Sequence, residues 1–356
     1  MLENNYIVIM AGGAGTRFWP ASTKAKPKQF LDILGIGKSL LRLTFERAMK
    51  LTKPEQIIVL TNRDYQHLVS SHCPELPLAN ILCEPSRNNT APAVAWAALH
   101  IDAIASKSTF AVLPSDHVII KEKKYIELLR LAFVSASSRN AIITLGIDPT
   151  RPDTGYGYIK YRESDEVVKK VEKFVEKPNL NTALEYLRDG HYLWNAGMFV
   201  WNTTTILNLF QEHSPQIINV LQEERDIFGT NREQEYIDRV FPLTENISID
   251  YAILEKADCV YTIPADIGWS DLGTWASLYD YKTTDAHINN VLIGNQIQTE
   301  DVEKLMVFSN TGKKILVRGL HNFIVVDDHE GLLIYPMDKE QELKKSLEKF
   351  KNTAGQ

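Results

Sequence analysis

Three glycines and two cations near the start of the chain form a pattern that suits phosphate binding. A short apolar run, Tyr6–Met10, is typical of a buried parallel strand, and a glycine-rich turn follows it. Because glycine has no Cβ, backbone N–H groups in such a turn can approach a bound anion closely. The residues concerned are Gly12, Gly13, Gly15, Arg17 and Lys28. Together they predict a nucleotide site, whereas the glycines alone also fit a tight strand-to-loop turn.

This turn matches neither of the two common phosphate-binding loops. The pattern GxxxxGK[ST] is absent, and Phe18 stands where GxGxxG requires its third glycine. The missing glycine disfavours a dehydrogenase built on a Rossmann sheet.

Two aspartates lie where a metal ion could be held. Asp116 follows the apolar run Phe110–Leu113, and ligands of open α/β sheets bind at the ends of such strands. Asp271 lies far away in sequence, in the glycine-rich stretch Asp266–Trp275. Mg²⁺ takes one or two carboxylates and completes its shell with phosphates and water. The alternative for each aspartate is local: a turn at the strand end, and a cap of a helix beginning near Leu272.

The elements that must position these residues indicate an α/β protein. Up to about residue 150, apolar runs alternate with helix-like stretches, which predicts a doubly wound sheet. The expected strands are Tyr6–Met10, Ile57–Leu60, Phe110–Leu113 and Ala141–Gly146, and the expected helices are Ser39–Lys50, Asp64–Ser71, Ala91–Ala105 and Lys123–Ser137. From 151 to about 285 the pattern is mixed, with strands at Gly155–Tyr161 and Val168–Glu176 and helices near Leu180–Asp189 and Thr204–Gln211. The fold class is therefore a Rossmann-like doubly wound mixed sheet.

The character of the sequence changes after residue 285. Short β-like runs are separated by turn residues, and a last helix carries Leu343, Leu347 and Phe350 on one face. The runs are Val291–Ile293, Lys304–Phe308, Lys314–Val317, Phe323–Val326 and Gly331–Tyr335. We expect a catalytic domain over 1–285 and a small β-rich appendage ending in a helix over 286–356.

The glycine-rich segment resembles the signature GGxGxR(L/F)xP…PK of the sugar-phosphate nucleotidyltransferases. Here the signature is Gly12-Gly13-Ala14-Gly15-Thr16-Arg17-Phe18-Trp19-Pro20, and it closes with Pro27-Lys28. The variants Phe18-Trp19-Pro20 and Lys28-Gln29-Phe30 are most similar to those of mannose-1-phosphate guanylyltransferases, and the resemblance extends over roughly residues 5 to 285. It implies the nucleotidyltransferase fold, with a left-handed β-helix-like appendage.

The resemblance also implies roles for individual residues. Asp116 and Asp271 should bind Mg²⁺. The expected catalytic residues are Arg17, Lys28, Asp116, Lys177 and Asp271. The expected nucleotide-binding residues are Ala11, Gly12, Gly13, Gly15, Thr16, Arg17, Lys28, Glu84, Asn89 and Asp116. The expected sugar-phosphate-binding residues are Gly157, Glu176, Lys177 and Asn195, the last in a sugar-binding turn over Trp194–Val200.

Glu84 is the candidate for reading the base, since relatives that use thymidine or uridine nucleotides commonly have a glutamine at this position. Guanine presents two neighbouring donors, N1–H and N2–H₂, and one carboxylate can accept from both. A loop ion pair between Glu84 and Arg87 is the equally weighted alternative.

The implied reaction transfers GMP from GTP to mannose 1-phosphate and releases pyrophosphate. The alternatives are a nucleotidyltransferase for another pair of sugar 1-phosphate and nucleotide, and a catalytically silent module that only binds nucleotide sugars. The presence of Asp116, Asp271 and Lys28 argues against the silent module.

Composition limits the partners and the compartment. The 356 residues carry a net charge of −6, which attracts neither nucleic acid nor an anionic membrane. No apolar run is long enough to span a bilayer. The three cysteines have no CxxC spacing, which indicates small buried side chains and a reducing cytoplasm. A homodimer is compatible with the sequence, which does not fix the oligomeric state.

Overall fold

The computed structural model describes residues 4–13, 16–283 and 289–353. The chain falls into two compact units. The first unit comprises Met1–Gly12, Thr44–Ser115 and Ile119–Trp269, and the second comprises Gly13–Leu43, Asp116–Val118 and Ser270–Gln356. The predicted boundary at residue 285 lies outside the described residues, and the division into 1–285 and 286–356 stays a prediction.

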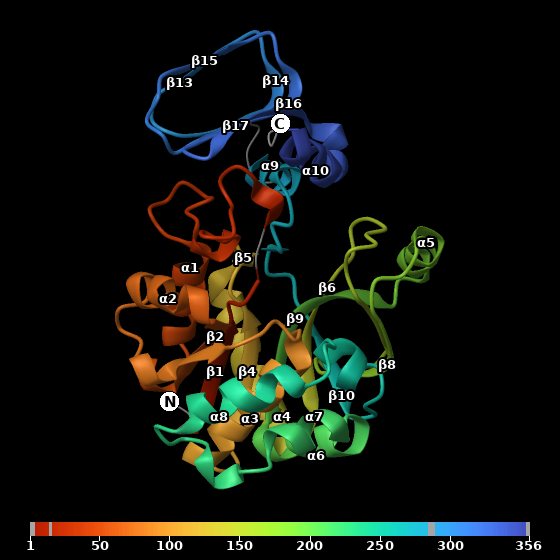
Figure 1. Cartoon of the computed structure of the whole chain (residues 1–356). Coiled ribbons are helices and arrows are strands. Elements are labelled where there is room, and N and C mark those ends of the chain that lie inside the picture. Colours follow the sequence, from red (N-terminus) through yellow and green to blue (C-terminus); the bar gives the residue numbers. More distant parts are fainter. Residues whose placement is uncertain (1–3, 14–15, 284–288, 354–356) are drawn as a thin grey trace. The chain divides into compact units, whose positions relative to one another are not determined.

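Strands and helices alternate through most of the chain (Figure 1). The strands are β1 (Asn5–Met10), β2 (Ile57–Asn62), β3 (Ile81–Glu84), β4 (Thr109–Pro114), β5 (Val118–Ile119), β6 (Ile142–Ile147), β7 (Tyr158–Tyr161), β8 (Lys169–Val175), β9 (Tyr192–Asn202), β10 (Val260–Pro264), β11 (Trp269–Ser270), β12 (Asn290–Ile293), β13 (Ile297–Glu300), β14 (Glu303–Ser309), β15 (Ile315–Arg318), β16 (His321–Asp328) and β17 (Gly331–Pro336). The α-helices are α1 (Leu40–Met49), α2 (Gln66–His72), α3 (Thr90–Ile104), α4 (Glu122–Arg139), α5 (Leu180–Asp189), α6 (Thr203–His213), α7 (Pro215–Leu221), α8 (Glu233–Val240), α9 (Trp275–Thr283) and α10 (Leu343–Thr353).

A nine-stranded mixed sheet forms the centre of the first unit, in the order β3-β2-β1-β4-β9-β6-β10-β8-β7. Neighbours among β3, β2, β1 and β4 are parallel, with Val8 opposite Ile58 on one side and Val112 on the other. These apolar, β-branched strands are buried, as expected for a parallel sheet covered by helices. The predicted Rossmann-like mixed sheet is confirmed.

Strand β9 differs from the prediction. It runs antiparallel between β4 and β6, and it contains the whole stretch Trp194–Val200 that the sequence indicated as a sugar-binding turn. The aromatic and β-branched side chains around this stretch favour a strand, whereas the turn was expected from the resemblance to the family. The register shifts between Gly146–Asn195 and Thr144–Phe199, and Gly197 at φ +66° lies in the resulting bulge. Asn195 therefore lies on a bulged strand.

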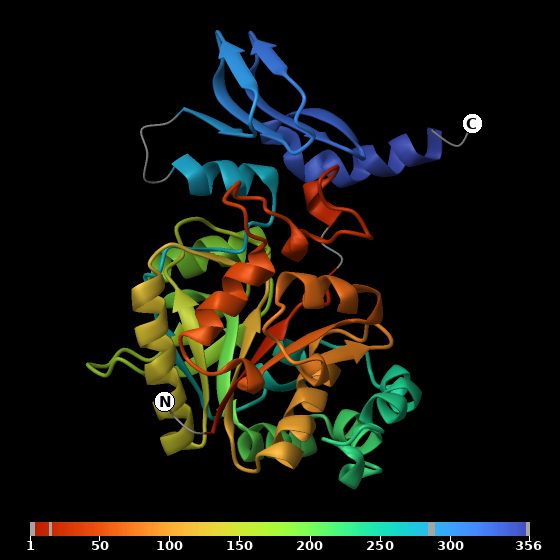
Figure 2. The same cartoon turned by 90° about the vertical axis from the view of Figure 1, so that its left-hand side faces the viewer.

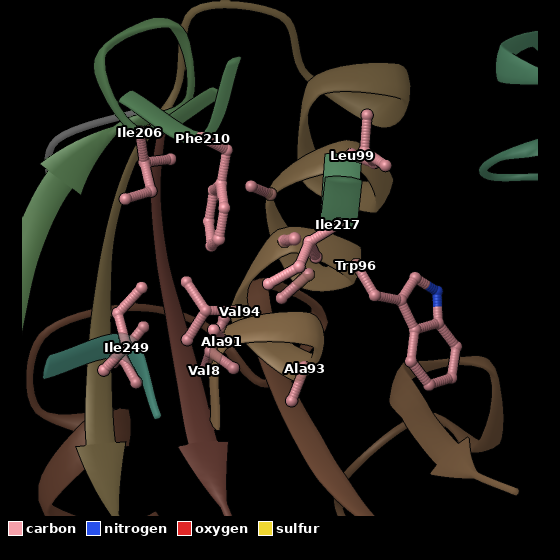
Figure 3. Packing of buried hydrophobic residues seen from close by; sticks show 14 of the residues in the cluster. Val8, Ala91, Ala93, Val94, Trp96, Leu99, Ile206, Phe210, Ile217 and Ile249 are labelled. Carbon is pink, nitrogen blue, oxygen red and sulfur yellow. The ribbon is translucent and has the colours of Figure 1, made fainter. Parts of the chain in front are cut away.

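Helices α3, α6 and α7 bury a common hydrophobic core against the parallel strands. Figure 3 shows Phe210 of α6 and Ile217 of α7 beside α3, with Val8 of β1 and Ile249 in the same cluster. The middle of α3 is apolar on all sides and buried, which is typical of a core helix.

The last part of the second unit is β-rich, as predicted (Figure 2). Strands β12, β14 and β16 pair in parallel, and β17 pairs antiparallel with β16 at the edge of the same sheet. Strands β13 and β15 pair in parallel in a separate sheet. Since the two sheets take strands alternately along the chain, the arrangement is β-helix-like. The apolar face predicted for α10 is only partly buried. Leu343 lies in the hydrophobic core of the second unit and Leu347 packs against this core, whereas Phe350 is 60% exposed.

Cys73 and Cys83 are buried and Cys259 is partly buried, and none of them forms a disulfide with another described residue. Within the described ranges, no helix has the length and apolar character needed to cross a membrane.

Candidate active site

A pocket of about 350 Å³ in the second unit gathers four of the five predicted catalytic residues. Its lining consists of Arg17, Phe18, Lys28, Asp116, His117, Asp271 and Gly273. Arg17 is exposed, and Cβ on Gly273 would lie 3.5 Å from its Nη1. Three segments that are distant in sequence therefore supply cations and carboxylates to one cavity.

Lys28 links the two aspartates of this pocket. Its Nζ donates to Asp116 Oδ2 at 2.9 Å and to the backbone carbonyl of Asp271, and it lies 5.8 Å from the centre of the Phe18 ring. The Lys28 side chain is only 7% exposed. Burial alone would raise the pKa of Asp116, but the ammonium of Lys28, aided by His117, lowers it below its ordinary value. Asp116 is thus an anion at neutral pH.

Short local structures hold these side chains in place. Lys28 begins a 3₁₀ turn after Pro27, and the side-chain amide of the next residue, Gln29, donates to the carbonyl of Gly13 at 2.9 Å. Asp271 closes a turn by accepting from the N–H of Gly273 at 3.1 Å. The cap alternative required a helix beginning near Leu272, but α9 begins at Trp275.

The donor set of the pocket fits a hard divalent cation that brings ligands of its own. Asp116 and Asp271 offer two carboxylates, and Mg²⁺ is commonly held by one or two. The described residues contain no cluster of three or more His, Cys, Asp or Glu that could hold a metal ion by itself. An ion here would therefore complete its shell with phosphate oxygens and water.

Glu84 lies at the end of β3 in the first unit, with its carboxylate against the start of the glycine turn. Cβ on Gly12 would lie 2.8 Å from Glu84 Oε2, so a larger residue there would require the carboxylate to shift. The carboxyl ends of β1, β2 and β3 share one edge of the sheet, which brings Glu84 and Gly12 together. Burial raises the pKa of Glu84 to about 8, although Arg87 opposes this rise.

The ion pair that was the alternative role for Glu84 is not found in the described part of the chain. Arg87 donates to the hydroxyl of Tyr65 at 3.0 Å and lies over its ring at 5.9 Å. Glu84 is 7% exposed, and its carboxylate has no hydrogen-bond partner among the described residues. A ligand that donates hydrogen bonds would stabilise this carboxylate in its ionised form.

The predicted sugar-phosphate residues come together in the first unit. Cβ on Gly157 would lie 2.5 Å from Glu176 Oε2 and 3.3 Å from the Cβ of Asn195. The backbone N–H of Asn195 donates to the carbonyl of Gly157 at 2.8 Å. Lys177 pairs with Glu176 and has φ +47°, a strained conformation that is concentrated at functional sites.

Asp250 lies beside these residues, although no motif in the sequence indicated it. Asn195 Nδ2 donates to Asp250 Oδ1 at 3.0 Å. Asp250 starts a π-helical turn, Asp250–Leu254, in a stretch whose apolar spacing predicts an ordinary helix. The only sequence signal was a lone acid ahead of an apolar run.

The remaining predicted nucleotide residues lie around the turn or apart from it. The N–H of Ala11 donates to the carbonyl of Leu60 at 2.7 Å, and Asn89 caps α3 by accepting from the N–H of Thr90 at 2.9 Å. Gly15 lies outside the described residues, and the Thr16 side chain is not described.

Comparison with known proteins decides the family. The model of the nucleotidyl transferase family matches residues 6–287. The chain belongs to the nucleotidyl transferase family. The resemblance stated from the sequence is confirmed, and the chain is a sugar-phosphate nucleotidyltransferase.

Individual relatives of this nucleotidyltransferase match over nearly its whole length. It is 37% identical to "Alginate biosynthesis protein AlgA" of Pseudomonas fluorescens, over 96% of this chain and 70% of that protein. It is 34% identical to "Mannose-1-phosphate guanylyltransferase" of Sinorhizobium fredii, over 99% of this chain and 70% of that protein. The crystal structure of "mannose-1-phosphate geranyltransferase" from Thermus thermophilus matches with a TM-score of 0.88 and 30% identity, over 98% of this chain and 99% of that one.

Proposed function

We propose that this nucleotidyltransferase transfers GMP from GTP to mannose 1-phosphate, giving GDP-mannose and pyrophosphate. The observation that carries the proposal is the pocket in which Arg17, Lys28, Asp116 and Asp271 meet. The names of several relatives support the choice of mannose 1-phosphate and a guanine nucleotide. The cytoplasmic location and the homodimer remain predictions from the sequence.

The chemistry is an in-line attack of the sugar-phosphate oxygen on the α-phosphorus, with pyrophosphate as leaving group. This oxygen needs no general base, because the second pKa of a phosphomonoester is about 6. His117 therefore needs no proton-transfer role, although it lines the pocket. The two substrates carry about six negative charges together, so catalysis depends on neutralising and aligning them.

Three cationic side chains would take part in this neutralisation. Arg17 and Lys28 would hold the phosphates that leave, and Lys177 would hold the phosphate of the acceptor. Asp116 and Asp271 would hold Mg²⁺, which neutralises phosphate charge when it is bound.

Glu84 would select guanine. Its unpartnered carboxylate beside Gly12 can accept from N1–H and N2–H₂ of the base. Guanine would thus supply the donors that the described residues do not.

Pyrophosphate release from a panel of substrates tests the proposal. GTP, ITP, ATP, UTP and dTTP are each paired with mannose 1-phosphate and with glucose 1-phosphate. We expect GTP with mannose 1-phosphate to give the highest kcat/KM, with activity lost in EDTA and restored by Mg²⁺. A different best pair would replace the substrate assignment, and no release from any pair would favour a binding module.

A further inference from the structure

Asp250 is a partly buried carboxylate that the proposed chemistry does not use. It follows Ile249, which is buried in the core beside α3 (Figure 3) and whose N–H donates to Thr90 Oγ1 at 2.9 Å. Asp250 then opens the π-helical turn Asp250–Leu254. Such turns are rare and occur frequently at functional sites. The core therefore fixes the position of the Asp250 backbone.

The π-helical turn is attached to both acceptor-side residues. At its start, Asp250 Oδ1 accepts from Asn195 Nδ2 at 3.0 Å, while Asn195 Oδ1 accepts from the N–H of Gly197 at 2.9 Å. Just after its end, Glu255 Oε1 accepts from the backbone N–H of Glu176 at 3.1 Å. Both ends of the Asn195 amide are thus engaged, which fixes its donor end toward Asp250.

Glu176 also offers an acceptor to a ligand. Its side chain is 8% exposed, and its Oε1 pairs with the ammonium of Lys177. Its Oε2 has no hydrogen-bond partner among the described residues and lies over Gly157, where a Cβ would be 2.5 Å away. A carboxylate oxygen that accepts no hydrogen bond from the described residues is suited to a donor from a ligand.

The charges in this group favour hydroxyl donors. Burial, and then the carboxylate of Glu176, raise the pKa of Asp250 to about 6. Asp250 is therefore mostly ionised at neutral pH and acts only as an acceptor. Two carboxylates held near each other repel, and neighbouring hydroxyls of a sugar ring can donate to both.

We propose that Asp250 determines specificity for the acceptor sugar: its carboxylate and Glu176 Oε2 accept hydrogen bonds from hydroxyls of the sugar ring. The inference rests on the proposed function, because it takes the acceptor to be a sugar 1-phosphate. It adds a residue outside the motifs that the sequence analysis used.

Three variants separate a sugar contact from mere positioning of Asn195. Asp250→Asn keeps an oxygen that can accept from Asn195 Nδ2, so it removes the charge while preserving that contact. Asp250→Ala removes both. The exposed Asp165→Asn is the matched control for loss of one carboxylate from the same unit.

Kinetics and calorimetry are measured on the full chain with mannose 1-phosphate and its 2-, 3- and 4-deoxy analogues. We expect Asp250→Asn to raise KM for mannose 1-phosphate about ten- to hundredfold, with KM for GTP within about twofold of wild type. At least one deoxy analogue should bind the wild type more weakly than mannose 1-phosphate does. In Asp250→Asn the two ligands should bind equally well. Asp165→Asn should match the wild type.

Two outcomes overturn the proposal. In the first, each deoxy analogue loses the same affinity relative to mannose 1-phosphate in the wild type and in Asp250→Asn. The other is an unaffected Asp250→Asn beside an impaired Asp250→Ala, which would make Asp250 a positioning residue only. If the wild type binds mannose 1-phosphate but does not turn it over, the proposed function fails while calorimetry still decides the role of Asp250. Absence of binding to the wild type overturns both.

Discussion

The carboxylate of Glu84 combines burial, a raised pKa and the absence of a hydrogen-bond donor among the described residues. A protonated carboxyl offers one donor and one acceptor, whereas an ionised carboxylate accepts only. Guanine, with two donors side by side, should bind best to the ionised form. The guanine preference of the free enzyme is therefore expected to strengthen as pH rises toward 8.

Replacing Glu84 by glutamine tests the reading of guanine. Glu84→Gln keeps the size of the side chain but turns a donor amide toward a donor edge. We expect kcat/KM for GTP to fall about tenfold to hundredfold, because a buried polar group is left unpaired at a cost of about 1–3 kcal/mol. ITP lacks the N2 amino group and should lose less. An unchanged ratio of GTP to ITP use would remove Glu84 from base selection.

The stability of the same variant provides a control that needs no nucleotide. Burial raises the pKa of Glu84 from 4.5 to about 8, so the folded state binds more protons than the unfolded state between these values. The wild type should therefore lose stability as pH rises from 5 to 8. Glu84→Gln does not titrate there, so its free energy of unfolding should gain on the wild type by on the order of 2 kcal/mol. Urea unfolding at both pH values measures the difference.

At the scale of elements, the edge of the sheet next to Glu84 is held by a helix. Gln234 of α8 accepts from the N–H of Cys83 at 3.3 Å and donates to its carbonyl at 2.8 Å. Since β3 is an edge strand, this side chain takes the place of a neighbouring strand. Gln234 thereby positions Glu84, which follows Cys83 in the chain.

Removal of this bridge should affect the nucleotide more than the sugar. We expect Gln234→Ala to lower kcat/KM for GTP about threefold to tenfold, to narrow the preference for GTP over ITP, and to leave KM for mannose 1-phosphate unchanged. The loss of three hydrogen bonds, one of them to Asp238, should also cost about 1–3 kcal/mol of stability. Steady-state kinetics beside the exposed Gln211→Ala check this, and equal effects on both substrates would contradict it.

Features that depend on local interactions could be predicted from the sequence, whereas features that depend on contacts between distant residues could not. Runs such as Ile57–Leu60 carry their own strand preference and burial pattern, so the parallel half of the sheet could be predicted. The bulge at Gly197 depends on pairing with β6, far earlier in the chain, and local sequence does not contain the register of Gly146 with Asn195. Asp250 was missed for the same reason, since only its contact with Asn195 distinguishes it from a surface acid. The pocket residues were predictable because a motif named them without any knowledge of the fold.

At the scale of the whole molecule, strands β12, β14, β16 and β17 share one hydrophobic core with the wall of the candidate pocket. Trp275 is fully buried in the second unit, with its ring 4.9 Å from that of Phe18 and 5.1 Å from that of Phe308. Its indole N–H donates to the carbonyl of Trp19 at 3.2 Å. Phe18 also lines the pocket, so the β-rich strands support a residue of the candidate site.

Truncating this side chain should therefore remove activity through packing. Trp275→Ala is expected to destabilise the second unit by about 3–5 kcal/mol and to abolish pyrophosphate release, because the Phe18 wall loses its support. The 66% exposed Leu316→Ala in the same unit should change stability by less than about 0.5 kcal/mol. Urea unfolding followed by circular dichroism, with trypsin cleavage sites, makes the comparison. Full activity in Trp275→Ala would show that the pocket stands without this core.

The three separate segments of the second unit have a consequence for how the protein is made. Arg17 and Asp116 leave the ribosome before Asp271 and before strands β12, β14 and β16, which belong to the same unit. At about 5–20 residues per second, the nascent chain carries Arg17 for roughly 10–50 s before Asp271 exists. During translation the glycine turn and its cations are thus exposed without their final neighbours, while the central sheet already has most of its strands. The complete lining of the pocket can form only after Asp271 has been synthesised.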